Sequence, residues 1–485
     1  MNSLKRDNMT LALIIENTDD LVSIIQKYGK NHPLIELRID KDANLINQIE
    51  YMNSENLIVT YRSREEGGEN QYYSKDRKSV ILSLADVKPK YLDLEFNRDL
   101  SLLPKLTDQQ WIIISIHDYI QPMSERVQYY HQLIQEKNLF YQYSNLILKF
   151  VGKPIDSLDM LESINFIKKQ YQRSIILGID QNSFFTRTLR NFYTQEFVFC
   201  ALKKHIIPEC EKLHKLDSDS LITGLIGKKL TYTKSPIIHE IFREQTNLSG
   251  YYHILEFQKV DGINKFFDFP DSRQFNGFNV TQPYKESILT FIEKRSKDVE
   301  LIQTTNTIKV ENKVLKAYNT DISGFTTFFK NQNLEKNKSV LICGMGGVAK
   351  AVIKSLNELN FQIYCTNRTK SRFDESTDYI KNSVTFIDKE ELEKIKTDIV
   401  INATTIGLKG ENLFDHFAIN KNIETFIDLI YFDTPSLEYS KYLGMKTYNG
   451  LEMLFHQAAD AFEIWTNIKL DRNEAYTHFK EVLVN

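Results

Sequence analysis

The sequence predicts an α/β protein made of two parts, an N-terminal (β/α)8 barrel and a C-terminal unit with two further α/β domains. Three observations lead to this prediction. A chain of 485 residues is too long for one ordinary hydrophobic core. Short apolar runs alternate with helix-like segments up to about residue 216, and a new alternation begins at Leu221. Further on, a strand runs into a glycine-rich turn and a helix at Lys338–Ala349.

Composition argues against several classes of protein. The hydrophobic content of 42% and the charged content of 26% are typical of globular proteins. A net charge of −3 gives no electrostatic reason to expect nucleic acid or a membrane surface as a partner. No apolar run approaches the ~20 residues that cross a bilayer, and a first strand near Met9 leaves no room for a targeting peptide. The four cysteines lack the spacing of a metal site. We therefore expect a soluble cytoplasmic protein that needs no metal.

The N-terminal part contains eight apolar runs that we interpret as strands. They are Thr10–Glu16, Leu34–Ile39, Leu57–Tyr61, Tyr91–Glu95, Trp111–Ile116, Leu146–Phe150, Ser174–Ile179 and Phe197–Leu202. The segments between them, such as Asp19–Tyr28 and Ser157–Gln170, carry apolar residues at helical spacing. This spacing fits a compact barrel, although it also allows an open doubly wound sheet. The polar residues favour the barrel, in which active sites lie at the carboxyl ends of the strands.

Charged and polar side chains occur on or just after several of these strands. They are Glu36, Arg38, Arg62, Glu66, His117, Lys149 and Arg187. Glu36 and Arg38 share one face of their strand, because alternate residues do. An arginine inside a barrel is costly unless it is paired, so we expect Glu36 to be the partner of Arg38. Singly, each residue has an ordinary structural explanation, such as a Lys149 side chain that snorkels to the surface. Their shared position at strand ends favours an active site.

The motifs that carry these residues resemble type I 3-dehydroquinate dehydratase over about residues 9–215. The motifs are Glu-Leu-Arg-Ile-Asp at 36–40, Arg62 followed by Glu66-Gly-Gly, Ser-Ile-His-Asp at 115–118, and a lysine within an apolar strand. The resemblance implies that Lys149 forms a Schiff base with the ketone of 3-dehydroquinate and that His117 moves the proton. Histidine can accept and donate a proton near neutral pH, as this step requires.

The same resemblance implies roles for the remaining polar residues. Glu36 supports the covalent step, Arg38, Arg62 and Glu66 contact the substrate, and Arg187 anchors its carboxylate. The family's serine and Pro-Gly-Gln lid after the eighth strand are replaced here by Ile-Ile-Pro-Glu-Cys at 206–210. We expect this replacement to raise KM before it abolishes the covalent step, because the strands hold the reacting side chains.

In the second part, Gly277–Lys285 reads Gly-Phe-Asn-Val-Thr-Gln-Pro-Tyr-Lys. One loop, stiffened by proline, therefore presents the Asn279 amide, the Thr281 hydroxyl and the Lys285 ammonium. A carboxylate follows in Asn-Thr-Asp at 319–321, and the hydroxyls of Thr233 and Ser235 precede a proline. These hydroxyls also fit a helix N-cap. A surface ion pair between Lys285 and Asp321 would not explain the amides and hydroxyls beside it.

The stretch Lys338–Ala349 ends in a G-x-G-x-x-A turn, the form that lays a pyrophosphate on a helix N-terminus in Rossmann domains. The next strand ends in Asn-Arg-Thr-Lys-Ser-Arg at 367–372. An acidic residue there would hold a free ribose 2′-hydroxyl, whereas Arg and Thr suit a 2′-phosphate, which predicts NADP. The expected cofactor contacts are Gly344, Gly346, Gly347, Val348, Ala349, Asn367, Arg368, Thr369, Arg372, Thr404, Gly450 and Met453.

These motifs together resemble shikimate dehydrogenase over about residues 221–485. The resemblance implies that Lys285 and Asp321 flank the carbinol that is oxidised and that Asn306 and Asp321 bind the ring hydroxyls. It implies that Thr233 and Ser235 hold the substrate carboxylate. Further substrate contacts are expected from Asn279, Thr281, Tyr431 and Gln457, with Gly450 and Met453 beside the nicotinamide.

The sequence thus predicts a bifunctional shikimate-pathway enzyme, a lyase and an NADP-dependent oxidoreductase in one chain. We expect the barrel at residues 1–216, a substrate-binding domain at 221–325 completed by helices at 456–485, and the Rossmann domain at 326–455. Two alternatives remain. One is a dehydrogenase for shikimate or quinate with a weakened barrel, or one that uses NAD. The other is a non-catalytic metabolite sensor, against which the retained Lys149, His117, Lys285 and Asp321 argue.

Overall fold

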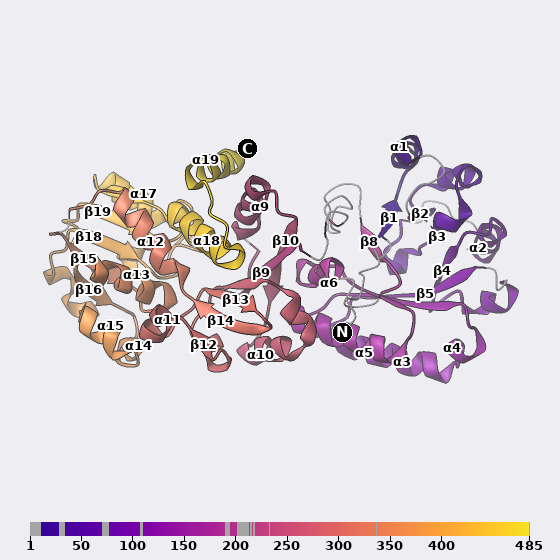
Figure 1. The fold of residues 1–485 in the computed structure, drawn as a ribbon, viewed down its shortest axis with the longest axis horizontal. Helices are drawn as coiled ribbons and strands as arrows, with labels where there is room; N and C mark the ends of the chain where they lie inside the picture. Colours follow the sequence, from indigo (N-terminus) through magenta and orange to yellow (C-terminus); the bar gives the residue numbers. More distant parts are fainter. Residues whose placement is uncertain are drawn as a thin grey trace. The chain divides into compact units, whose positions relative to one another are not determined.

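The computed structural model describes residues 11–28, 34–69, 77–106, 110–189, 195–200, 213, 216, 219–231, 233–335 and 337–484. The chain divides into two compact units, Met1–Ser220 with His253–Gln258 and Leu221–Tyr252 with Lys259–Asn485 (Figure 1). The altered lid segment at residues 206–210 and the last two residues of the expected eighth strand lie outside the described residues. Among the helices of the described ranges, none is long and apolar enough to cross a membrane.

The first unit contains an eight-stranded sheet in the order β7-β6-β5-β4-β3-β2-β1-β8. Its strands are β1 Leu11–Ile15, β2 Ile35–Arg38, β3 Leu57–Thr60, β4 Tyr91–Glu95, β5 Trp111–Asp118, β6 Leu146–Gly152, β7 Ser174–Gly178 and β8 Val198–Cys200. Neighbours pair in parallel. Just before β8, Glu196 N donates to Ser174 O of β7 at 3.1 Å, which joins the two ends of the sheet. The predicted barrel is therefore confirmed.

The helices of this unit follow the strands. They are α1 Thr18–Tyr28, α2 Arg77–Asp86, α3 Met123–Glu136, α4 Leu139–Gln142, α5 Ser157–Gln170 and α6 Phe185–Thr188. Helix α5 shows why they form where they do. Asp156 caps it by accepting from Leu158 N at 3.0 Å and Asp159 N at 3.1 Å. Lys168 and Lys169 lie in its last turn, where cations favour the helix dipole.

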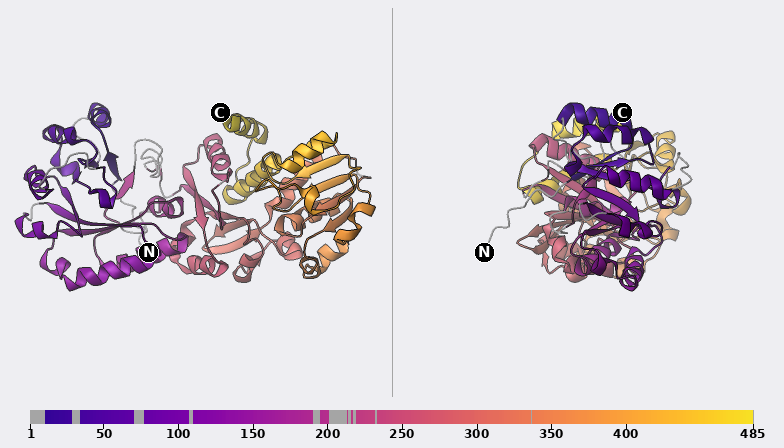
Figure 2. Two further views of the ribbon diagram at one scale, coloured as in Figure 1. Left: turned by 180° about the vertical axis from the view of Figure 1, so that it is seen from behind. Right: turned by 90° about the vertical axis from the view of Figure 1, so that its right-hand side faces the viewer.

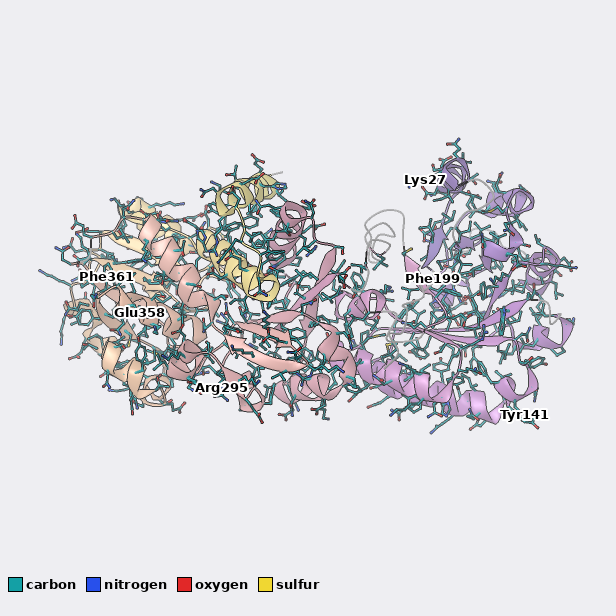
Figure 3. All side chains as sticks on the ribbon, viewed as in Figure 1. Lys27, Tyr141, Phe199, Arg295, Glu358 and Phe361 are labelled. Atoms are coloured by element: carbon teal, nitrogen blue, oxygen red, sulfur yellow. The ribbon has the colours of Figure 1, made fainter. Side chains whose placement is uncertain are left out.

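The barrel interior contains an apolar layer to which every strand contributes from its own residues or the residue before it. The layer includes Ala12, Leu34, Ile58, Tyr91, Ile113, Ile147, Ile175 and Phe199 (Figure 3 labels Phe199). Residues two positions further along each strand point the same way. This register therefore defines the next layer toward the carboxyl ends of the strands, and β2 to β6 each contribute a polar residue to it.

From Leu221 onward the chain first forms a six-stranded mixed sheet in the order β10-β9-β11-β13-β14-β12. Its strands are β9 Leu221–Gly227, β10 Gly250–Glu256, β11 Gly277–Val280, β12 Lys294–Arg295, β13 Thr307–Glu311 and β14 Val314–Tyr318. Its helices are α9 Ser235–Thr246, α10 Val260–Asp268, α11 Lys297–Ile302, α18 Leu451–Thr466 and α19 Arg472–Val484. Near the end of α18, Trp465 Nε1 donates to Ile308 O of β13 at 3.0 Å, so the late helix packs on the early sheet.

The other six-stranded sheet is parallel, in the order β17-β16-β15-β18-β19-β20, which is the Rossmann order. Its strands are β15 Ser339–Cys343, β16 Gln362–Thr366, β17 Thr385–Phe386, β18 Ile399–Asn402, β19 Thr425–Asp428 and β20 Lys446–Tyr448. Its helices are α12 Thr320–Asn331, α13 Gly347–Glu358, α14 Ser371–Asp374, α15 Asp378–Ser383, α16 Leu413–His416 and α17 Pro435–Tyr442.

Helices cover both faces of this parallel sheet (Figures 1 and 2). Strand β15 shows why, because its alternate residues belong to two different cores. Val340 and Ile342 lie in one apolar cluster, and Leu341 and Cys343 lie in the other. A strand that is apolar on both faces must be covered on both. The fold brings the loop after β18, the loop after β11 and the start of α18 to one cavity.

Candidate active sites

A polar layer lies in the barrel two residues beyond the apolar layer. It consists of Glu36, Thr60, Asp93, Ser115 and Lys149, all buried. Each follows an interior apolar residue by two positions, as Lys149 follows Ile147 and Asp93 follows Tyr91. Strand alternation therefore aims all five side chains into the barrel. Buried ionisable groups are costly unless they are paired, and these are.

Lys149 lies at the centre of this layer, with 4% of its surface exposed. Its Nζ is 3.2 Å from Asp93 Oδ2 and 3.4 Å from Glu36 Oε1. The centroid of the Phe199 ring lies 4.1 Å from Nζ. Two carboxylates and an aromatic face stabilise a buried ammonium group. They also leave the amine close to two groups that can accept its proton, as a lysine nucleophile requires.

The carboxylates are held in turn by neighbouring polar groups. Thr60 Oγ1 donates to Glu36 Oε1 at 2.8 Å, and Ser115 Oγ donates to Asp93 Oδ1 at 2.6 Å. Arg62 Nη2 lies 2.9 Å from Asp93 Oδ2. The burial of these groups rigidifies the network, because each member loses its hydrogen bonds to water and depends on its protein partners.

His117 and Glu66 form an acid–base pair beside the lysine. His117 Nδ1 lies 2.9 Å from Glu66 Oε2. Burial, followed by the charges of Arg62, Lys149 and Arg38, holds the pKa of His117 well below its usual value. Burial, followed by the charge of Glu95, raises the pKa of Glu66 to about 8. The ring is therefore neutral at pH 7. When Nδ1 donates to Glu66, Nε2 keeps its lone pair and can accept a proton.

Two sequence-based expectations about the barrel are wrong in detail. Arg38 pairs with Asp40, through Nε to Oδ1 at 2.9 Å and Nη2 to Oδ2 at 2.7 Å, and not with Glu36. Strand β2 ends at Arg38, so Asp40 lies in the following turn and can fold back onto the guanidinium. His117 lies within β5 and not after it.

Arg187 lies at the same end of the barrel as the other predicted residues. Its Nη2 donates to Gly178 O, the last residue of β7, at 3.2 Å. Sequence analysis missed Asp93 and Ser115. The available signal was a charged or polar residue at an inward position of an otherwise apolar strand, because Asp93 alternates with Tyr91 and Ser115 with Ile113.

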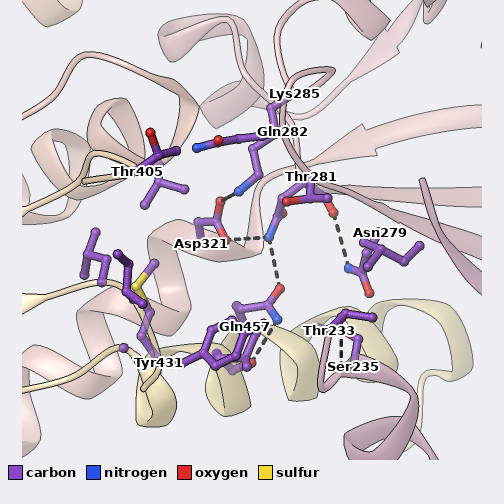
Figure 4. A pocket seen from close by; sticks show the side chains of 18 of the residues that line it. Thr233, Ser235, Asn279, Thr281, Gln282, Lys285, Asp321, Thr405, Tyr431 and Gln457 are labelled. Carbon is purple, nitrogen blue, oxygen red and sulfur yellow. Dashed lines mark hydrogen bonds and ion pairs between the residues drawn. The ribbon is translucent and has the colours of Figure 1, made fainter. Parts of the chain in front are cut away.

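The second unit contains a cavity of about 230 Å³ at the carboxyl ends of β11 and β18 (Figure 4). Most of the predicted substrate and nicotinamide contacts line it, namely Thr233, Ser235, Asn279, Thr281, Lys285, Asn306, Asp321, Val348, Thr404, Tyr431, Gly450, Met453 and Gln457. Lining residues that sequence analysis did not single out include Lys229, Gln282, Thr405 and Leu408. A cavity with apolar walls and a few convergent polar groups is typical of a small-molecule site.

Lys285 and Asp321 contact one another in the lining of this cavity (Figure 4). Lys285 Nζ lies 2.5 Å from Asp321 Oδ2, and both side chains are buried. Asn306 Nδ2 donates to the other carboxylate oxygen, Asp321 Oδ1, at 2.8 Å. Asp321 lies in the first turn of α12, where the helix dipole favours a negative charge. The pair can therefore pass a proton to a ligand without moving the carboxylate.

Further polar groups surround this pair. Asn279 Oδ1 accepts from Tyr252 Oη at 2.8 Å, and Asn306 Nδ2 donates to Gln457 Oε1 at 3.1 Å. Thr233 Oγ1 donates to Ser235 Oγ at 3.2 Å. The N-cap of α9 is Lys234, without a side-chain cap bond, so the N-cap expectation for the two hydroxyls is wrong. These hydroxyls line the cavity instead.

The glycine-rich turn is shaped to approach a ligand closely. Gly344 has φ +122°, a conformation that favours glycine, and a Cβ there would lie 2.7 Å from Ala403 O. Gly346 has open space beside it, and helix α13 begins at Gly347. A Cβ on Gly347 would lie 3.1 Å from Lys285 Cβ, so this turn borders the lysine. The free amides at the start of α13 suit a pyrophosphate.

The residues expected at the ribose phosphate follow β16. Arg368, Thr369 and Arg372 are exposed, so their polar groups are accessible to a ligand. Arg372 Nη1 lies 3.4 Å from Glu286 Oε2, while Lys350 Nζ of α13 lies 2.9 Å from Glu286 Oε1. No residue from 367 to 372 is acidic. The residues present therefore fit a dinucleotide with a 2′-phosphate. Within the described residues, no group of three or more His, Cys, Asp or Glu side chains is arranged for a metal ion.

Comparison with known protein families also divides the chain into an N-terminal and a C-terminal part. Residues 9–218 match the family model described as type I 3-dehydroquinase. Residues 225–308 match the shikimate dehydrogenase substrate binding domain, and residues 450–476 match the shikimate 5'-dehydrogenase C-terminal domain.

Curated relatives and solved structures match the second part. A shikimate dehydrogenase (NADP(+)) of Caldicellulosiruptor saccharolyticus is 34% identical over 255 residues, which cover 50% of this chain and 91% of that protein. A shikimate dehydrogenase (NADP(+)) of Clostridium beijerinckii is 34% identical over 254 residues, which cover 51% of this chain and 93% of that protein. The solved structure of shikimate dehydrogenase 1 from Peptoclostridium difficile is 32% identical, has a TM-score of 0.48, and covers 54% of this chain and 98% of its own.

The fold and the two sites define an α/β enzyme with two catalytic units, a barrel with a buried lysine among carboxylates and a dinucleotide-dependent dehydrogenase. The chain belongs to the shikimate dehydrogenase family. A type I 3-dehydroquinase domain precedes the dehydrogenase in the same polypeptide, so the chain is a bifunctional shikimate-pathway enzyme.

Proposed function

We propose that the protein converts 3-dehydroquinate to shikimate in two steps, a dehydration in the barrel and a reduction in the second unit. One observation carries this proposal. Each unit has a buried lysine, Lys149 or Lys285, among the acid–base groups that its reaction requires. The small dissolved acids on which the enzyme would act also favour a cytoplasmic location.

In the barrel, the Lys149 amine attacks the ketone carbon of 3-dehydroquinate, and loss of water gives an imine. Asp93 and Glu36 are close enough to Nζ to accept the proton that the ammonium loses. The imine acidifies the neighbouring C–H bond, whose proton passes to Nε2 of His117. The same ring returns the proton to the departing hydroxyl, which leaves as water as the C=C bond forms. Hydrolysis of the imine releases 3-dehydroshikimate and restores the amine.

Three arginines at the carboxyl ends of the strands favour an anionic substrate in the barrel. We assign Arg38, Arg62 and Arg187 to substrate binding, and Arg187 binds the substrate carboxylate. Asp40 and Asp93 hold the first two in fixed orientations. Fixed guanidinium groups bind a carboxylate with less loss of side-chain entropy than free ones do.

In the second unit, Lys285 and Asp321 supply the proton that accompanies reduction of the ketone. NADPH, when bound, provides the hydride. The carbonyl oxygen gains a proton from Lys285 Nζ, and Asp321 stabilises the lysine through the transfer, since the two groups are 2.5 Å apart. Asn306, Asn279, Thr281, Tyr431 and Gln457 orient the ring hydroxyls, and Thr233 and Ser235 hold the carboxylate.

We assign NADP as the cofactor, with Gly344, Gly346 and Gly347 at the pyrophosphate. Val348 and Ala349 continue this contact, and Thr404, Gly450 and Met453 border the nicotinamide. Asn367, Arg368, Thr369 and Arg372 bind the ribose 2′-phosphate. Asn367 Nδ2 donates to Thr369 O at 2.9 Å, which stabilises the turn that carries the two arginines.

We propose the domain limits 1–216 for the barrel, 221–325 with 456–485 for the substrate-binding domain, and 326–455 for the NADP domain. The packing of Trp465 against Ile308 supports the assignment of the late helices to the substrate-binding domain. The two six-stranded sheets of the second unit support its division into two domains.

A coupled assay tests the proposed function. The full-length protein is incubated with 3-dehydroquinate and NADPH, and each product is resolved by chromatography. We expect shikimate to form with one NADPH oxidised per molecule. Reduction of added 3-dehydroshikimate without conversion of 3-dehydroquinate would leave a dehydrogenase with an inactive barrel. Binding of the acids without any conversion would favour a metabolite sensor.

A further inference from the structure

The cavity of the second unit has an unbalanced positive charge. Among the residues that line it, the charged ones are Lys229, Lys285 and Asp321. Lys285 and Asp321 neutralise one another at 2.5 Å. Lys229 is exposed, and no acidic side chain in the described part of the second unit forms an ion pair with it. The lining therefore carries a net charge of about +1, which favours an anionic ligand.

The backbone before Lys229 explains how an exposed lysine borders this cavity. Gly227 ends β9, and a Cβ there would lie 2.6 Å from Leu230 Cδ2 and 2.8 Å from Thr281 Cγ2. The glycine thus allows the loop to turn tightly against the loop that carries Lys285. Leu230 is buried at this contact. Lys229, directly before it, lines the cavity, whereas its neighbour Lys228 does not.

The two hydroxyls assigned to the substrate carboxylate have no charge of their own. Thr233 follows Lys229 in the same loop, Ser235 begins α9, and both line the same cavity. Part of their hydrogen-bonding capacity is used within the pair, which is 3.2 Å apart. A carboxylate that leaves water for this cavity loses hydration, and neutral donors replace only part of it. The ammonium of Lys229, which lines the same cavity, can supply the missing charge.

We propose that Lys229 is a specificity-determining residue of the dehydrogenase, the cation that recognises the carboxylate of the substrate beside Thr233 and Ser235. This assignment rests on the proposed function of the second unit and adds the residue that selects acids over neutral analogues. Because Lys229 is at the edge of the cavity, it acts on substrate capture and not on hydride transfer. Its removal therefore changes KM and leaves kcat unaltered.

The experiment uses the full-length protein and the variant Lys229→Gln, with Lys228→Gln as the matched control. Shikimate oxidation by NADP is measured at low and high salt, and shikimate methyl ester serves as the uncharged probe. We expect Lys229→Gln to raise KM for shikimate about tenfold at low salt, with kcat and KM for NADP unchanged. The difference in KM between the parent and Lys229→Gln should shrink at high salt, which screens the charge–charge attraction. It should be absent for the ester, which has no carboxylate charge. Lys228→Gln and Lys229→Arg behave as the parent.

An unchanged KM for shikimate in Lys229→Gln would overturn the assignment, as would an equal loss with the ester. A raised KM for NADP alone would also overturn it and would assign Lys229 to the cofactor phosphates. If the parent does not oxidise shikimate, the proposed function itself fails. Calorimetric titration of both proteins with shikimate and its ester then still decides whether Lys229 selects the carboxylate.

Discussion

The two buried lysines that we assign to catalysis, Lys149 and Lys285, differ in what holds them. Lys149 lies within a barrel strand, between the carboxylates of Asp93 and Glu36, and its surroundings continue into further buried ion pairs. Lys285 lies on the loop after β11 and contacts Asp321, whose other oxygen accepts from an amide. The position of Lys149 is therefore fixed by strand β6, whereas the position of Lys285 is fixed by its contact with Asp321.

This difference matches the two kinds of chemistry. A nucleophile must be aimed at one carbon atom, and a strand inside a closed barrel allows little movement. A proton donor need only come within hydrogen-bond distance of an oxygen, and a loop at the edge of a cavity is sufficient. We therefore expect the barrel lysine to be irreplaceable for its reaction and the loop lysine to be strongly but less absolutely required.

The largest expected effect is that of Lys149→Ala, which should lower the dehydratase rate by at least ~10³-fold, because the variant lacks the amine that we assign to the imine. Borohydride reduction in the presence of 3-dehydroquinate, followed by peptide mass mapping, should add mass at Lys149 of the parent and none in the variant. Lys137→Ala, at an exposed position, is the control and should retain the adduct. If no lysine of the parent gains mass, the barrel is an inactive scaffold.

The next effect concerns the second unit. Lys285→Ala and Asp321→Asn should each lower kcat for reduction of 3-dehydroshikimate by ~10²-fold or more, the usual size of an acid–base contribution. Steady-state kinetics measures this loss, and the dehydratase rate of the same preparations serves as the internal control. Near-parental reduction in either variant would reject the proton-relay assignment.

The third expected effect is the preference for NADP over NAD, which should be no larger than the loss of kcat in the Lys285 and Asp321 variants. Charge-assisted contacts to the 2′-phosphate are worth about 1.5–3 kcal/mol each, so kcat/KM should favour NADP over NAD by ~10²-fold. Arg368→Ala should remove most of this preference. Lys370→Ala is the matched control, because Lys370 lies in the same turn and pairs with Asp388. Equal kcat/KM for the two cofactors in the parent contradicts the assignment.

The smallest expected effect is on stability and concerns the barrel. The folded pKa of Glu66 is about 8, above the ordinary value of 4.5, because the carboxyl is buried near Glu95. Between these values the folded barrel holds a proton that the unfolded chain has released, so stability falls as pH rises toward about 8. Thermal unfolding across this range should show that fall for the parent and a flatter profile for Glu66→Gln.

Glu125→Gln, at an exposed position of α3, is the control for this measurement and should follow the parent. A profile of Glu66→Gln that is as steep as that of the parent would mean that other groups cause the pH dependence. Arg62 acts in the opposite direction on Glu66, since its charge favours the carboxylate. The observed slope therefore measures how far burial outweighs this attraction.

The pattern of neighbouring residues in the sequence determined where most of the predicted strands and helices lie. All eight expected barrel strands are present, with β4 matching Tyr91–Glu95 and helix α5 matching Ser157–Gln170 at both ends. The glycine-rich turn begins a Rossmann helix at Gly347. These features depend on strand alternation, helix capping and glycine geometry, which are properties of neighbouring residues.

Only the tertiary structure decided which polar groups pair. Glu36 was expected beside Arg38, two positions away, yet it lies 3.4 Å from Lys149, which is 113 positions away. Closure of the barrel brings these residues together, and the turn after β2 gives Arg38 a different partner in Asp40. The role of Asp93 and the place of Lys229 on a cavity wall depend on the same kind of distant contact. Alternation tells which way a side chain points, but the partner it meets depends on strands and loops that only the folded chain brings near.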